Sequence, residues 1–152
     1  MSARPSLDLD VRLWIYERFA QLGTAPSSLE IADAFGIEPI DAEASLLRLS
    51  RDHDALVLSP GTTEIWMAEP FSAVPTSFGV RGFDGRTWWG NCIWDGLGIL
   101  GLLGCDGVVE TPCPDCGSLL RVEIRDNALS GDAGVVHFAV PAAEWWRDIG
   151  FT

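Results

Sequence analysis

Positive charge is scarce in this sequence. The chain contains no lysine, so its ten basic residues are all arginine, against 22 acidic residues and a net charge of −12. The imbalance is spread evenly, with 12 acids and 5 arginines before Pro75 and 10 acids and 5 arginines after it. Nucleic acids and anionic membrane surfaces attract basic patches. This distribution therefore argues against binding to either by charge.

Long hydrophobic runs are also missing. No segment resembles a signal peptide, because residues 1–10 are largely polar and no long apolar stretch follows. The longest apolar run, at 99–103 with its neighbours, is too short to span a bilayer. We therefore expect a cytoplasmic protein with no membrane segment. Its four cysteines would stay reduced and act as ligands or nucleophiles rather than as disulfides.

The first half of the sequence predicts three helices and a hairpin. The expected elements are helices at about 9–23, 28–35 and 39–51, and strands at 55–58 and 64–67. Ser27 and Glu30 have the spacing of a capping box at the start of the second helix, and Gly36 suits its end. In the third helix, periodicity predicts that Ile40 faces the core.

Three helices followed by a hairpin is the element order of a winged helix, a class that often reads DNA. The third helix would be the reader, but it carries acidic residues alongside Arg48 and Arg51. It lacks the excess positive charge that contact with phosphates requires. We therefore expect residues 1–75 to form a winged-helix-like module that packs against or covers the remainder, with nucleic acid not among its partners.

The remainder, residues 76–152, predicts a small mixed or antiparallel sheet with one central helix, which gives an α+β fold. The expected elements are strands near 78–80, 87–89, 108–111, 119–125 and 135–140, a helix from 91 to about 103 and a short helix from 141. The segment 127–134 is expected to be a turn, since it is rich in glycine and aspartate. The glycines at 96, 98 and 101 indicate either an irregular helix or close approach by another backbone.

The strongest candidate site lies at the start of the central helix. Asn91 is a suitable N-cap, which would place Cys92 at the first helical position, where the helix dipole favours a thiolate. Asp95 follows three residues later, on the same face of the helix. A nucleophilic sulfur beside a carboxyl group suits catalysis. The alternative is a buried structural cysteine next to a capping aspartate.

Four side chains are candidates for a substrate pocket around this pair. Trp88, Trp89 and Trp94 flank it in the sequence and would form an apolar lining. His137 alternates with apolar residues in the expected strand at 135–140. It is therefore either a hydrogen-bonded core residue or a fourth pocket residue.

A second candidate site is the CxxC pair formed by Cys113 and Cys116, separated by a proline and an aspartate and followed by a glycine. A structural zinc site needs four ligands, and Cys105 is the tentative third. The pair would otherwise be a tight turn without metal, or a dithiol open to other soft metals or to oxidation.

The residues around Cys92 resemble those of the alkylmercury lyase family. The shared features, in the same order, are the segment Trp-Gly-Asn-Cys-Ile-Trp-Asp-Gly-Leu at 89–97, a strand ending at Cys113, Val-His-Phe at 136–138, and Glu-Trp at 144–145. The resemblance implies cleavage of a carbon–mercury bond in a small organomercurial, with no cofactor. Cys92 would capture the mercury and Asp95 would protonate the leaving carbon.

The sequence departs from that family at one catalytic position. The family's second catalytic cysteine corresponds to the segment 131–135, and no cysteine follows Cys116 in this chain. Either Cys105 or the CxxC pair takes its place in space, or the chemistry differs. Two further hypotheses therefore remain: a protein that binds or senses zinc, copper or mercury through the CxxC pair, and a non-metal enzyme that uses Asp95 or His137 as acid or base.

Overall fold

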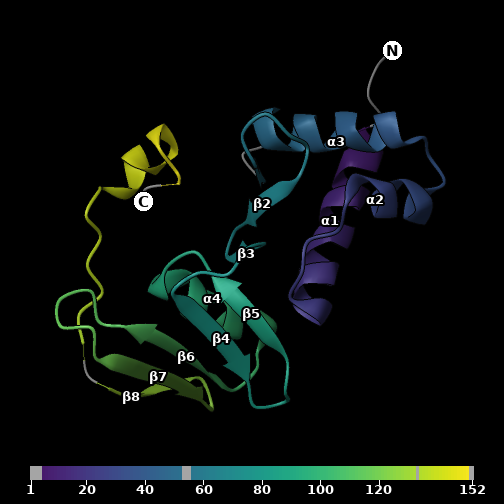
Figure 1. The fold of residues 1–152 in the computed structure, drawn as a ribbon. Helices are drawn as coiled ribbons and strands as arrows, with labels where there is room; N and C mark the ends of the chain where they lie inside the picture. The colour runs from purple at the N-terminus through teal and green to yellow at the C-terminus, as the bar shows by residue number, and fades with distance from the viewer. Residues whose placement is uncertain (1–4, 53–55, 133, 151–152) are drawn as a thin grey trace.

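The computed structural model describes residues 5–52, 56–132 and 134–150 and has the expected α+β fold (Figure 1). The elements are, in order, α1 (Pro5–Leu22), α2 (Ser28–Phe35), α3 (Pro39–Asp52), β1 (Val57–Leu58), β2 (Ile65–Ala68), β3 (Phe71–Ser72), β4 (Phe78–Gly82), β5 (Thr87–Gly90), α4 (Ile93–Leu103), β6 (Gly107–Pro112), β7 (Leu119–Arg125), β8 (Ala128–Gly131) and the 3₁₀ helix η1 (Ala142–Arg147). None of the helices in these ranges is long and apolar enough to cross a membrane.

The three N-terminal helices form as the sequence predicts, with one exception. The capping box of Ser27 and Glu30 is present, and Gly36 ends α2 in the left-handed conformation. A buried carboxylate joins α1 to α3: Asp8 accepts hydrogen bonds from Ser45 and, through both oxygens, from Arg48. The exception is Ile40, which is 69% exposed at the start of α3 and does not face the core.

All eight strands belong to one antiparallel sheet, in the order β1-β2-β3-β5-β4-β6-β7-β8. The strand β3 lies between the two halves, where Ser72 pairs with Met67 of β2 and Phe71 pairs with Gly90 of β5. The sheet therefore continues across position 75, and one core cluster draws on both halves of the chain. The division into two domains at this position stays a prediction.

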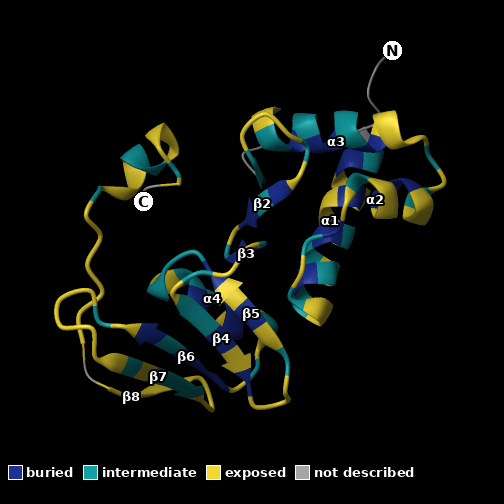
Figure 2. Ribbon diagram, viewed as in Figure 1, coloured by how far each residue is buried: buried dark blue, intermediate teal, exposed yellow. Residues whose placement is uncertain are grey.

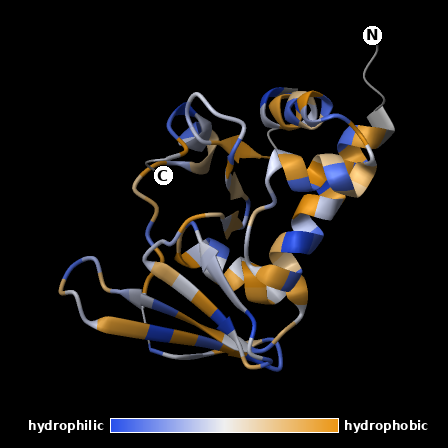
Figure 3. Ribbon diagram, turned by 45° about the vertical axis from the view of Figure 1, so that its right-hand side comes forward, coloured by the Kyte–Doolittle hydropathy of each residue, from blue (hydrophilic) through white to orange (hydrophobic). Residues whose placement is uncertain are grey.

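The end of the sheet corrects two expectations. The segment 135–140 is not a strand, and the segment expected as a turn instead contains β8, which pairs with β7. The turn itself falls at Asp126 and Asn127, which have φ values of 49° and 61°. Positive φ at both central residues is the requirement of a type I′ hairpin turn. Hydrophobic and hydrophilic residues alternate along β7, whose residues are exposed or partly buried, in the part of the sheet coloured in alternating orange and blue in Figure 3.

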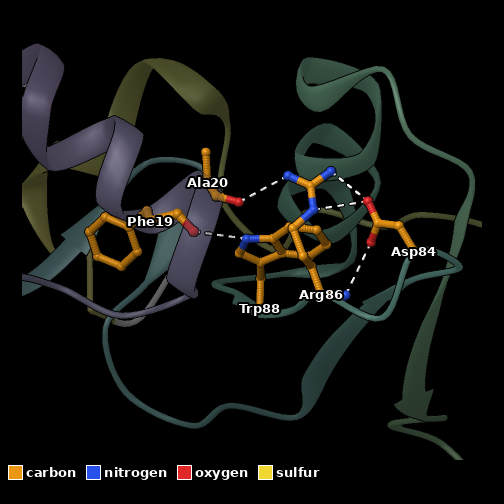
Figure 4. Close-up of polar contacts among 5 residues, drawn as sticks. All are labelled: Phe19, Ala20, Asp84, Arg86 and Trp88. Carbon is orange, nitrogen blue, oxygen red and sulfur yellow. Dashed lines mark hydrogen bonds and ion pairs between the residues drawn. The ribbon is translucent and has the colours of Figure 1, made fainter.

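The helix α1 is joined to β5 through its own C-terminal carbonyl groups (Figure 4). Trp88, which is buried, donates its indole N–H to the Phe19 carbonyl oxygen at 2.8 Å. Arg86 donates to the Ala20 carbonyl oxygen at 3.1 Å while pairing with Asp84. The Phe19 carbonyl oxygen also accepts from the Gly23 backbone N–H at 2.8 Å. The Ala20 carbonyl belongs to the last turn of α1, where carbonyls have no partner within the helix, so Arg86 satisfies it. The two bonds hold the end of α1 against β5.

The helix α4 packs closely against the sheet through two glycines. A Cβ atom on Gly90 would lie 2.7 Å from the backbone nitrogen of Gly96, and a Cβ atom on Gly96 would lie 2.8 Å from Cγ1 of Val109. Gly101, by contrast, has open space around its Cα. The expected close approach of another backbone therefore occurs at Gly96, which positions the first turn of α4 against β5.

Candidate thiol and carboxyl site

Cys92 is the N-cap of α4 rather than its first helical residue, which corrects the sequence-based expectation. Its Sγ atom accepts a hydrogen bond from the backbone N–H of Asp95 at 3.4 Å. Asn91, the expected cap, uses its side-chain amide differently and donates to the carbonyl oxygens of Pro70 and Phe71 at 3.4 and 3.5 Å. The reactive end of the helix is thereby tied to β3.

Cys92 and Asp95 border the same small cavity, of about 40 Å³. It is lined by Met67, Glu69, Asn91, Cys92, Asp95, Phe138, Trp145 and Ile149. Strand β2, the start of α4 and the C-terminal segment all contribute. Both groups of the predicted pair can therefore reach one bound molecule.

Burial favours the neutral forms of both groups. It raises the pKa of the Cys92 thiol, and the negative charge of Asp95 raises this pKa further, which outweighs the hydrogen bonds from backbone amides. Burial also raises the pKa of the Asp95 carboxyl, although hydrogen bonds from Asn91 and Cys92 oppose this effect. The expectation of a helix dipole that lowers the thiol pKa is not met. The site instead favours a thiol beside a carboxyl group that retains a proton more readily than usual.

Glu69 is a site residue that the sequence reasoning missed. It borders the cavity, and the pKa of its carboxyl is raised by partial burial and by the charge of Asp95. It lies in the two-residue turn between β2 and β3, where the sequence offered no motif. The order of elements along the chain does not reveal that the turn before β3 lies beside the start of α4.

The C-terminal segment 134–150 forms one wall of the cavity through Phe138, Trp145 and Ile149. In Figure 2 its course is coloured as exposed and intermediate, and none of its described residues is buried. Its far end contacts β2, since a Cβ atom on Gly150 would lie 2.6 Å from the Trp66 ring. The cavity is thus closed on this side by a segment with few buried contacts.

The four predicted pocket residues lie in different places. Trp88 points toward α1 (Figure 4), and Trp89 is 36% exposed on the other face of β5. His137 is exposed in the segment that was expected to be a strand. None of these three is among the residues that line the cavity. Trp94 lies beside the site, with its ring packed edge-on against Phe138 at 6.3 Å.

The other three thiols lie outside the cavity lining. Cys105 follows the C-terminal end of α4, at the opposite end of that helix from Cys92. Cys113 and Cys116 occupy the turn between β6 and β7, where Cys116 is exposed and donates to the Ser118 hydroxyl at 3.3 Å. Across 5–52, 56–132 and 134–150, no three His, Cys, Asp or Glu side chains gather in a way that could hold a metal ion. The CxxC pair therefore has neither a third nor a fourth ligand of these types within those ranges.

The fold and this cavity define a class of α+β protein with a half-buried cysteine and an acidic partner at the start of one helix. The chain belongs to the alkylmercury lyase family. The model of this family, described as "MerB: Alkylmercury lyase", matches residues 71–152, more than half of the chain. No curated protein matches it.

One solved structure with a similar fold is described as "Crystal structure of the mercury-bound form of MerB2". The two chains superpose with a TM-score of 0.64 at 20% sequence identity. The match covers 83% of this chain but only 59% of that one. It therefore supports the fold over a larger part of the chain than the family match spans.

Proposed function

We propose that this protein captures organomercurials at Cys92 and cleaves their carbon–mercury bond with a proton from Asp95. The observation that carries the proposal is the shared cavity, in which a thiol and a carboxyl group with raised pKa values interact directly. Membership of the alkylmercury lyase family and the fold shared with mercury-bound MerB2 point to the same chemistry.

In the first step the Cys92 sulfur bonds to mercury and the thiol proton leaves with the displaced anion. A soft sulfur is the preferred ligand for a soft metal. In the second step Asp95 donates its proton to the carbon, the carbon–mercury bond breaks, and the hydrocarbon departs. The raised pKa of Asp95 suits this step, because the carboxyl must hold a proton until the carbon can accept it.

The product is a mercuric ion bound to the Cys92 sulfur and the Asp95 carboxylate. Since no other thiol borders the cavity among the described residues, release requires thiols from solution. Two thiols would take the mercury as a dithiolate and return one proton each to Cys92 and Asp95. This restores the starting state without a cofactor, and it predicts that turnover depends on added thiol.

The test is incubation with phenylmercury or methylmercury in excess thiol, with benzene or methane followed by gas chromatography. We expect Cys92→Ser to abolish both capture and release. Asp95→Ala should retain capture but slow release by about 10²- to 10⁴-fold, the usual contribution of a positioned acid. Cys105→Ser is the matched control, since its sulfur lies outside the cavity lining and both steps should be unchanged.

Release no faster than in a thiol-only control would refute the lyase function. Tight mercury binding that persists in that case would leave a mercury-binding protein. Unchanged release in Asp95→Ala would instead refute the assignment of the proton donor alone.

A second candidate function is soft-metal binding by Cys113 and Cys116. The observation that favours it is the placement of both sulfurs on one accessible turn, between β6 and β7. Two thiolates suffice for a linear two-coordinate metal, whereas zinc needs four ligands. Metal that is bound after purification, lost in Cys113→Ser and retained in Cys92→Ser, would support this function.

A further inference from the structure

An aromatic groove adjoins the small cavity at Cys92. It is lined by Trp94, Phe138, Ala139, Val140, Pro141, Ala142 and Trp145, and its volume is about 540 Å³. Phe138 and Trp145 also line the cavity that contains Cys92 and Asp95. The two spaces therefore adjoin each other at these two side chains, and the groove is the neighbouring space that a molecule held at Cys92 would meet on this side.

The residues that line the groove are all apolar, and three of them are aromatic. Phe138 packs against Trp94 at 6.3 Å and against Trp145 at 5.2 Å, measured between ring centroids. The indole N–H of Trp145 already donates to the Val140 carbonyl oxygen at 2.8 Å. Trp94 is 59% exposed and Phe138 41% exposed, an unusual amount of exposed aromatic surface beside a candidate site.

The volumes of the two spaces suggest different occupants. Apolar cavities of about 150 Å³ bind benzene, so the 40 Å³ at Cys92 is too small for an aryl group. The groove is large enough. Two-coordinate mercury is linear, so a hydrocarbon group on mercury points directly away from the sulfur that holds it. A group larger than methyl must therefore leave the small cavity.

We propose that the groove of Trp94, Phe138 and Trp145 binds the hydrocarbon group of the organomercurial held at Cys92, and that it selects aryl over methyl compounds. This inference rests on the proposed function for its substrate class. Stacking and edge contacts with the aromatic rings would hold an aryl group, whereas a methyl group would not reach them.

The test is a competition between phenylmercury and methylmercury for the full-length Asp95→Ala variant, which under the proposed function captures mercury but cleaves the carbon–mercury bond slowly, so that the adducts persist. Both are supplied in equal amounts with glutathione, so that capture is reversible, and the two adducts are counted by intact mass spectrometry. The Cys92→Ser variant gives the background from the other three thiols. We expect phenyl adducts to predominate at Cys92, and Trp94→Ala to reduce the phenyl-to-methyl ratio by about 2- to 10-fold, the range of one aromatic contact.

The structure offers a matched control within one short helix. Trp146 follows Trp145 in η1 but lines neither space and is 48% exposed. Trp146→Ala should therefore leave the ratio unchanged. Phe138→Leu provides a second, milder variant of the groove, in case Trp94→Ala alters folding as judged by circular dichroism.

The outcomes separate this inference from the proposed function. Phenyl selectivity at Cys92 without hydrocarbon release would refute the lyase function but support the groove. Hydrocarbon release without phenyl selectivity would support the lyase function but refute the role of the groove. The inference would be overturned if Trp94→Ala and Phe138→Leu reduced the phenyl and methyl adducts equally. It would also be overturned if Trp146→Ala changed the phenyl-to-methyl ratio as much as Trp94→Ala does.

Discussion

Two glycines of α4 should respond to alanine substitution in opposite directions. Gly96 faces the sheet, where a Cβ atom would lie 2.8 and 3.2 Å from the two Cγ atoms of Val109. Val109 is fully buried and β-branched, so it has little freedom to move. Gly101 lies in the same helix, and a Cβ atom added there would have nothing within 4 Å. The two sites thus differ mainly in the space available.

The expected magnitudes follow from this difference. Replacing a helical glycine by alanine gains about 0.5–1 kcal/mol through backbone entropy, so Gly101→Ala should stabilise the protein by that amount. Gly96→Ala gains a similar term but adds overpacking, which costs about 1–3 kcal/mol. Because the entropy gain largely cancels in the comparison, Gly96→Ala should be less stable than Gly101→Ala by about 1–3 kcal/mol.

Urea unfolding followed by circular dichroism at 222 nm measures this difference directly. For a chain of this length, each kcal/mol corresponds to a shift of about 2–4 °C in the melting temperature, so thermal scans provide a second reading. If Gly96→Ala stabilised the protein as much as Gly101→Ala, the close contact between α4 and β6 would be refuted. An equal loss of stability in both variants would indicate that helix packing extends to Gly101.

Two further predictions concern Cys92 and Trp88. Burial and the Asp95 charge raise the pKa of Cys92, so its alkylation rate should reach half-maximum at a higher pH than that of a free cysteine. Asp95→Asn removes the charge and should lower the pH of the half-maximum. An unchanged midpoint in Asp95→Asn would contradict the interaction between Cys92 and Asp95. Trp88→Phe removes the indole N–H that donates to the Phe19 carbonyl oxygen, which keeps its hydrogen bond from the Gly23 backbone N–H, and should cost about 0.5–1.5 kcal/mol in urea unfolding. Trp89→Phe, on the exposed face, should cost little. Equal losses in the two variants would contradict the contact between Trp88 and Phe19.

The elements that were predicted correctly are those with strong local signals. The bounds of α2 follow from the capping box at Ser27 and the glycine at position 36, and both features act within one turn of helix. The bounds of β7 follow from its alternation of apolar and charged residues. In these segments the local sequence and the tertiary structure favour the same conformation.

The predictions that failed depended on distant partners. Asn91 is the stronger capping residue by preference, but its side chain bonds to Pro70 and Phe71, so Cys92 caps the helix instead. The segment 135–140 alternates like a strand, yet the free edge of β7 is occupied by β8. The signal for β8 was the pair Asp126 and Asn127, since both residue types tolerate the positive φ of a tight hairpin turn.

The candidate site was predicted in part. The proximity of Cys92 and Asp95 was predicted because Asp95 follows Cys92 by three residues, within one helical turn, and both border the same cavity. Its walls were not, because Glu69 and the C-terminal segment reach the cavity through contacts that span long stretches of chain. The tryptophans nearest in sequence misled the prediction, since successive residues of β5 point to opposite faces of the sheet.

The bonds from β5 to the end of α1 have a consequence for folding as a whole. They join residues that are 66 and 69 positions apart in the sequence, so the last turn of α1 and the start of β5 stabilise each other. We expect the chain to unfold in a single cooperative transition rather than half by half. A fragment limited to the family-matched region 71–152 would lack the partners of Trp88 and should not fold independently.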